Sequence, residues 1–304
     1  MGWSLNVEFL MRLFFASLAC AFVQTTGCAS AAPAAPARGE TLSVQAGRDT
    51  RELILYAPAK ADGPVPVVLV FHGGGGGADW MAGKSRELTR TLNSAGYAVA
   101  YMNGSSRRGG DNLRTWNAAN CCAYAQRKKI NEAHYADAAI EALDQRLEID
   151  RSRVFLAGHS NGAMLSYRLA GAMKVTPRGI APISGAIFAD QPGVPDRTSI
   201  FMYHAMDDDV LSYSGNPDDK AERWRTQPHL GYVKAEAKLA ELKSCGPGSA
   251  TSAPEGVGVT TRQCAGGSVL IATTASSGGH EWPARPKTDY RIEETLLAFF
   301  NSQK

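Results

Sequence analysis

The stretch Val154-Phe155-Leu156-Ala157-Gly158-His159-Ser160-Asn161-Gly162 decides the fold of this chain. Its apolar beginning predicts a buried strand, and the following residues 163–167 predict a helix. Small residues on both sides of Ser160 allow a sharp, strained turn between the two elements. Such a turn lifts a hydroxyl out of the backbone to where a base can reach it. Ser160 is therefore the candidate nucleophile.

A second apolar run, residues 66–71, predicts another buried strand, and it ends in His72 followed by the five glycines of residues 73–77. Glycine lets the backbone approach a ligand closely and turn its N–H groups towards it. We expect the amides of Gly74 and Asn161 to hold the negative oxygen of a tetrahedral intermediate. The alternative is a surface linker. A phosphate-binding loop is excluded because no Gly-Lys-Ser/Thr follows.

Two further strand-like runs lead to the candidate acid and base. Residues 199–204 run into Asp207-Asp208-Asp209, where one acid is expected to orient a histidine and the other two to act as turn or cap residues. Residues 268–274 lead to Gly278-Gly279-His280-Glu281-Trp282-Pro283, a loop that can carry an imidazole to Ser160. The order nucleophile, acid, histidine is the one that a Gly-x-Ser-x-Gly turn requires.

The remaining histidines have simpler interpretations. Two lie in the glycine motifs and support turns, one is packed at a strand end, and two are expected at the surface: His72, His159, His204, His134 and His229. The chain has no His-x-x-x-His and no Cys-x-x-Cys pattern, so no metal site is predicted and no cofactor is implied.

Taken together, the motifs resemble the polyhydroxybutyrate depolymerase and feruloyl esterase branch of the α/β-hydrolases, carbohydrate esterase family one. The matching pieces are His72-Gly73-Gly74, Trp116-Asn117 with Cys121-Cys122, the Ser160 pentapeptide, Asp208-Asp209-Val210 with Tyr213, and Gly279-His280-Glu281-Trp282-Pro283. The resemblance implies Ser160 as nucleophile, His280 as base and Asp208 as acid. The chain departs from the family at residues 130–135 and at Ala163, and the first departure affects the loop beside the pocket.

The alternation of strand-like and helical runs predicts one α/β domain over residues 41–304, with a mostly parallel sheet and helices on both faces. Residues 97–101 form a further predicted strand. Residues 133–147 have helical spacing, and Leu230, Val233 and Leu242 mark another helix. Ligands bind beyond the carboxyl ends of parallel strands, which is where all the candidate site segments lie.

Residues 1–31 are interpreted as a secretion signal, with Arg12 as the positive flank, residues 13–23 as the apolar core and Ala29-Ser30-Ala31 as the cleavage site. Met11 is an alternative start. The apolar core is too short to span a membrane. Residues 32–40 form an Ala/Pro-rich linker. The chain is therefore expected to be exported to the periplasm or the extracellular space, with lipid anchoring at Cys28 as the lesser alternative.

Charge and cysteine content restrict the partners. A net charge of +3 over 304 residues is too small to favour nucleic-acid binding. In an exported chain Cys245 and Cys264 are the preferred disulfide pair, and a bond between the neighbours Cys121 and Cys122 is disfavoured on geometric grounds. The alternative is that all four thiols are reduced.

The sequence thus predicts a serine esterase that works through an acyl-enzyme. Its expected substrates are phenolic (feruloyl) or acetyl esters of polysaccharides, or short hydroxyalkanoate oligomers. Trp282 and Trp116 are candidate walls of the acyl pocket, with core packing as the equal alternative. An acyltransferase on the same scaffold and a non-catalytic surface-binding protein remain as other functions. Oligomeric state is left open.

Overall fold

The computed structural model describes residues 39–107, 113–215, 226–284 and 290–303. The predicted secretion signal, the start of the linker, Met11 and Cys28 lie outside these residues. The described strands are β1 (Glu40–Ala46), β2 (Asp49–Tyr56), β3 (Val65–Phe71), β4 (Ala98–Met102), β5 (Ile149–His159), β6 (Gly179–Ile183), β7 (Ser199–Ala205), β8 (Ser249–Thr251), β9 (Val257–Gln263) and β10 (Val269–Ala275).

The described helices alternate with these strands over most of the chain. They are α1 (Ala78–Lys84), α2 (Arg86–Ser94), α3 (Ala123–Arg127), α4 (Glu132–Asp144), α5 (Asn161–Ala170), α6 (Tyr232–Leu242) and α7 (Ile292–Ser302), with a 3-10 turn η1 (Ala265–Gly267) before β10.

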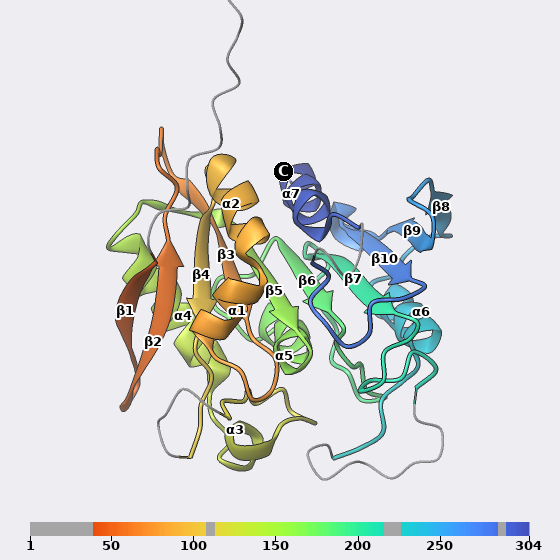
Figure 1. Ribbon diagram of the computed structural model, residues 1–304, viewed down its shortest axis with the longest axis horizontal. Helices are drawn as coiled ribbons and strands as arrows, with labels where there is room; N and C mark the ends of the chain where they lie inside the picture. The colour runs from red at the N-terminus through yellow and green to blue at the C-terminus, as the bar shows by residue number, and fades with distance from the viewer. Residues whose placement is uncertain (1–38, 108–112, 216–225, 285–289, 304) are drawn as a thin grey trace, which may run out of the picture. The chain divides into compact units, whose positions relative to one another are not determined.

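The strands form one sheet in the order β1-β2-β4-β3-β5-β6-β7-β10-β9-β8 (Figure 1). The six central strands from β4 to β10 are parallel, whereas β1 and β2 at one edge and β9 and β8 at the other pair antiparallel. The fold is therefore α/β with a mostly parallel sheet, as the sequence predicted.

Successive residues of the central strands bury their side chains on opposite faces of the sheet. In β3, Val67 and Leu69 belong to the core cluster that also contains residues of α4, α5 and α6, whereas Val68 and Val70 belong to the cluster that contains residues of α1, α2 and α7. A parallel strand covered on both faces needs apolar residues at every position, and all seven residues of β3 are buried. This explains why five of the six central strands could be predicted from apolar runs in the sequence; β6 was not predicted.

The cysteine pairing corrects one expectation. Cys245 and Cys264 are joined, as preferred, but Cys121 and Cys122 are joined to each other rather than separated. Both neighbours are buried, and the other two described thiols are already paired, so within the described chain no other thiol is left for either of them. The segment between Cys245 and Cys264, expected as an irregular connection, contains β8 and β9.

No helix in the described ranges is long and apolar enough to cross a membrane.

Candidate active site

Four parallel strands deliver the candidate residues to one edge of the sheet. β3 leads to His72 and the glycine loop, β5 to Ser160, β7 to the aspartates, and β10 to the loop that carries His280. In the sheet these strands follow each other as β3, β5, β6, β7 and β10, so their carboxyl ends are close neighbours (Figure 1). Residues that are 120 positions apart in the chain, such as Ser160 and His280, meet there.

Ser160 stands between β5 and α5 with φ 54° and ψ −117°, a backbone conformation that residues with a side chain rarely adopt. The flanking glycines are required by packing. A Cβ atom on Gly158 would lie closer than 3.0 Å to the backbone of Gly162, and one on Gly162 closer than 3.0 Å to the carbonyl of Phe71. The glycine pattern therefore reflects how tightly α5 packs onto β3 and β5.

The structure brings Ser160, His280 and Asp208 into hydrogen-bond contact. The distance from Ser160 Oγ to His280 Nε2 is 2.8 Å, and that from His280 Nδ1 to Asp208 Oδ2 is also 2.8 Å. A carboxylate only accepts hydrogen bonds, so the proton of a neutral His280 lies on Nδ1, and Nε2 accepts from the Ser160 hydroxyl. This is the tautomer in which an imidazole can act as a base towards serine.

Asp208 is held as a carboxylate by four hydrogen-bond donors. Its side chain is fully buried; Oδ1 accepts the amides of Val210 (3.0 Å) and Leu211 (2.7 Å), while Oδ2 lies 3.2 Å from His204 Nε2 and accepts from His280. Burial alone would raise the pKa of Asp208, but the hydrogen bonds from His204 and His280 outweigh it and lower that pKa far below its ordinary value. Asp208 therefore stays ionised.

The neighbouring aspartate has a different task. Asp207 accepts the amides of Gly278 (3.2 Å) and Gly279 (2.8 Å) through its two carboxylate oxygens. It thereby fixes the turn that precedes His280. The sequence indicated only a turn or cap residue at this position.

The glycine loop is ordered by His72. His72 Nδ1 donates to the carbonyl of Gly73 (2.7 Å) and Nε2 accepts the amide of Gly104 (3.0 Å). Burial lowers the pKa of His72 to about 4, so the ring is neutral at physiological pH and can make both bonds at once. Gly74 follows Gly73 and is exposed. Its amide donates to no acceptor in the described chain.

The second predicted oxyanion donor, Asn161, is the first residue of α5, so its amide has no acceptor inside the helix. Its side chain has a further function that the sequence did not reveal. Oδ1 accepts the amide of Trp116 (2.8 Å), and Nδ2 donates to the Trp116 carbonyl (3.2 Å) and contacts Cys121 Sγ (3.7 Å). The side chain of Asn161 thus binds the start of α5 to the backbone of Trp116.

The two tryptophans expected as pocket walls are both buried. Trp116 has no exposed surface; its indole N–H donates to the carbonyl of His72 (2.9 Å), and its ring packs edge-on against Phe71. Trp282 is 4% exposed and packs on the α1, α2 and α7 face. For Trp116 the substrate-binding role is corrected, because the ring is needed to hold the strand end that carries the glycine loop.

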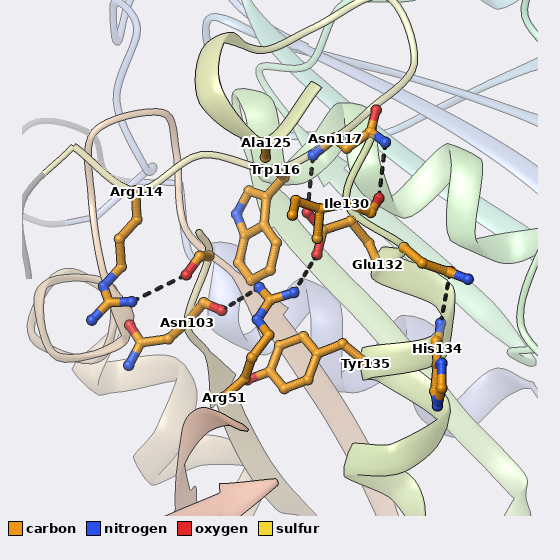
Figure 2. Close-up of polar contacts among 12 residues, drawn as sticks. Arg51, Asn103, Arg114, Trp116, Asn117, Ala125, Ile130, Glu132, His134 and Tyr135 are labelled. Carbon is orange, nitrogen blue, oxygen red and sulfur yellow. Dashed lines mark hydrogen bonds and ion pairs between the residues drawn. The ribbon is translucent and has the colours of Figure 1, made fainter. Parts of the chain in front are cut away.

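A buried ion pair between Arg51 and Glu132 supports the backbone next to Trp116 (Figure 2). Arg51 donates to Glu132 Oε2 (2.7 Å) and to the carbonyl of Asn103 (2.6 Å), and its guanidinium lies 3.8 Å from the centre of the Tyr135 ring. Glu132 Oε1 accepts the amide of Asn117 (3.0 Å). Glu132 lies within residues 130–135, the segment that departs from the family pattern.

His159 packs beside the reacting groups. Its ring centre is 5.1 Å from that of His280, and neither ring nitrogen has a partner among the described residues. Burial, with a smaller contribution from His280, lowers the pKa of His159 to about 3, so it is neutral. His229, expected at the surface, is buried.

Within the described ranges, no three histidine, cysteine, aspartate or glutamate side chains gather as a set of metal ligands.

No protein-family model matches this chain. Among curated proteins, one named as an esterase, NocK of Nocardia uniformis, is 26% identical over 259 residues, which is 79% of this chain and 72% of that protein. The bifunctional acetylxylan esterase/xylanase XynS20E of Neocallimastix patriciarum is 26% identical over 205 residues, 65% of this chain but only 28% of that protein. The resemblance to esterases inferred from the motifs is confirmed, and the chain is related to ester hydrolases.

Among solved structures, the acetyl xylan esterase from Aspergillus awamori superposes with a TM-score of 0.57 at 15% identity. The match covers 86% of this chain and 99% of that one. Together with the strand order, this likeness shows that the chain has the α/β-hydrolase fold.

Proposed function

We propose that this protein is an exported serine esterase that hydrolyses carboxylic esters through Ser160, His280 and Asp208. One observation carries the proposal: the hydroxyl of Ser160, on a strained turn, lies 2.8 Å from His280 Nε2, while His280 Nδ1 lies 2.8 Å from a buried carboxylate. A surface-binding protein has no need for this arrangement. The esterase names of the sequence relatives support the same reaction class.

In the proposed reaction, His280 Nε2 takes the proton of Ser160 as Oγ attacks the ester carbonyl. Asp208 holds the ring in the required tautomer and stabilises the imidazolium that forms. The amides of Gly74 and Asn161 bind the oxyanion, each worth about 3 kcal/mol of transition-state stabilisation. The protonated His280 gives its proton to the leaving alcohol, and it then activates water to release the acid from Ser160.

The proposed substrates are acetyl or feruloyl esters of polysaccharides, or short hydroxyalkanoate oligomers. The motif resemblance and the named acetylxylan esterase relative support the first class. Export follows from residues 1–31 as interpreted from the sequence.

The test is hydrolysis of p-nitrophenyl acetate and methyl ferulate by the wild type, Ser160→Ala and His280→Ala, with His134→Ala as the control for replacing an exposed histidine that is not part of the proposed triad. The proposal expects both site variants to lose about 10³-fold or more in kcat, with His134→Ala unchanged. A fluorophosphonate probe should label the wild type and not Ser160→Ala. Equal turnover and labelling by wild type and Ser160→Ala would overturn the proposal.

A further inference from the structure

An exposed tryptophan borders the glycine loop and takes no part in the proposed reaction. Trp80, on α1, is 45% exposed, whereas Trp116 and Trp282 are buried. Its ring lies against the loop: a Cβ atom on Gly76 would be 3.2 Å from Trp80 Cε3. An isolated exposed aromatic residue is not unusual by itself. Its significance comes from its surroundings.

Trp80 forms one wall of a cavity of about 430 Å³, within the range of sites for small molecules. The rest of the lining comes from residues 74–79 and Asn103. Gly74, whose amide is the proposed oxyanion donor, is part of this lining. A group bound in the cavity would therefore lie beside one of the two proposed oxyanion donors.

The cavity offers an aromatic face together with a hydrogen-bond donor and an acceptor. Asn103 is 8% exposed, and its Oδ1 accepts the amide of Ala78 (2.8 Å), which fixes the orientation of its side chain. Its NH₂ group donates to no other group in the described chain. The exposed Asp79 adds a carboxylate acceptor.

The indole is also connected to the loop of the catalytic base. Lys84 Nζ lies 5.6 Å from the centre of the Trp80 ring and 3.4 Å from Glu281 Oε2. Glu281 directly follows His280, which gives the proton to the leaving alcohol in the proposed reaction. Lys84 thus contacts both Trp80, beside the glycine loop, and Glu281, in the loop of the base.

We propose that this cavity binds the sugar ring of an acylated saccharide, with Trp80 as its stacking platform, so that the alcohol side of the substrate is a sugar hydroxyl. This inference rests on the proposed esterase function. A pyranose presents C–H groups to the electron-rich face of an indole and hydroxyls to Asp79 and Asn103. A hydroxyalkanoate chain has no ring face to stack on the indole.

The test compares two acetyl esters with the same acyl group, a methyl xylopyranoside carrying one acetyl group and glycerol monoacetate. Both have free hydroxyls, but only the first has a ring. We expect the ratio of their kcat/KM values, sugar ester over glycerol ester, to fall about five- to tenfold in Trp80→Ala, the size of one lost aromatic contact. Trp80→Phe should restore most of the ratio. Val233→Ala, an exposed apolar position on α6, is the matched control and should leave the ratio unchanged.

A second measurement separates the subsite from the chemistry. Xylotriose is titrated into Ser160→Ala and into Ser160→Ala/Trp80→Ala, and binding is followed by calorimetry. The subsite requires binding to the first that weakens about five- to tenfold in the second. An unchanged kcat/KM ratio in Trp80→Ala, or equal binding by the two variants, would overturn the subsite while leaving the esterase intact. If no ester is hydrolysed and the fluorophosphonate probe does not react, the esterase fails, and the titration still decides the subsite.

Discussion

The buried ion pair between Arg51 and Glu132 offers a quantitative test of how the site is supported. Their side chains are 8% and 2% exposed, and the closest atoms are 2.7 Å apart. Removing one partner of such a pair leaves a charge buried without compensation, at a cost of about 3–5 kcal/mol. We therefore expect Arg51→Met and Glu132→Gln each to lower the free energy of unfolding by about 3–5 kcal/mol. This is a large part of the roughly 5–15 kcal/mol by which a folded domain is stable.

The double variant Arg51→Met/Glu132→Gln should lose clearly less than the sum of the two single variants. It removes both charges, and the introduced amide side chain keeps an oxygen for the backbone N–H of Asn117, which Glu132 accepts at 3.0 Å. The expected coupling energy is about 2–3 kcal/mol. The free energies come from urea unfolding followed by tryptophan fluorescence, with kcat/KM on p-nitrophenyl acetate measured for the same samples.

The control is the exposed pair of Glu87 and Arg90, whose side chains are 55% and 38% exposed. The corresponding cycle with Glu87→Gln and Arg90→Met should give a coupling energy below about 1 kcal/mol. If the losses in the free energy of unfolding add within about 0.5 kcal/mol, Arg51 and Glu132 do not form a desolvated charge pair and do not support the backbone next to Trp116 as a unit.

Three further predictions concern the site itself. Asp208→Asn should lower kcat/KM about 10³- to 10⁴-fold, because the amide no longer enforces the required tautomer of His280. Asp207→Asn keeps one acceptor for the glycine turn and should lower kcat/KM less than about tenfold. Gly162→Ala should lower the free energy of unfolding by about 1–3 kcal/mol, measured in urea, because the new Cβ meets the end of β3. The free energy of unfolding should also fall as the pH is lowered, because the pKa values of His72 and His159 are lowered to about 4 and about 3 in the folded chain. Between about pH 6.5, the pKa of an unfolded histidine, and pH 4.5, these protons bind mainly to the unfolded chain. Each histidine should therefore contribute a loss of about 2–3 kcal/mol, measured by urea unfolding.

Each of these has an outcome that would count against it. Equal losses of kcat/KM in the two aspartate variants would mean that contact with His280 does not identify Asp208 as the acid of the triad. Gly83→Ala, on α1 where a Cβ meets nothing within 4 Å, is the control for Gly162→Ala, and equal stability of the two would remove the packing argument. A urea midpoint that is the same at pH 7.5 and pH 4.5 would show that the two histidines are not buried as neutral rings.

The parts of this molecule that are encoded locally were the ones that the sequence predicted. β3, β7 and residues 154–159 of β5 are buried at every position, and β10 is buried or half-buried throughout. Each of these strands is followed directly by its functional segment. The edge strands β8 and β9 have largely exposed or half-buried residues, which leaves no clear period in the sequence. Contacts between distant positions could not be predicted: Arg51 and Glu132 are separated by 81 residues, and nothing in the sequence pairs them.

The glycine loop shows why these distant contacts matter for the proposed chemistry. Residues 73–77 have no side chains to fix their backbone, so by itself the loop has the largest conformational freedom that a chain of this length can have. An oxyanion donor is effective only when it is oriented before the reaction. Here the orientation comes from outside the loop, because the ring of His72 binds its first carbonyl, the indole of Trp116 binds the preceding one, and the side chain of Asn161 holds the Trp116 backbone. The same residue, Asn161, thereby supplies one proposed donor with its amide and positions the other with its side chain, which gives a physical reason for asparagine after the nucleophile.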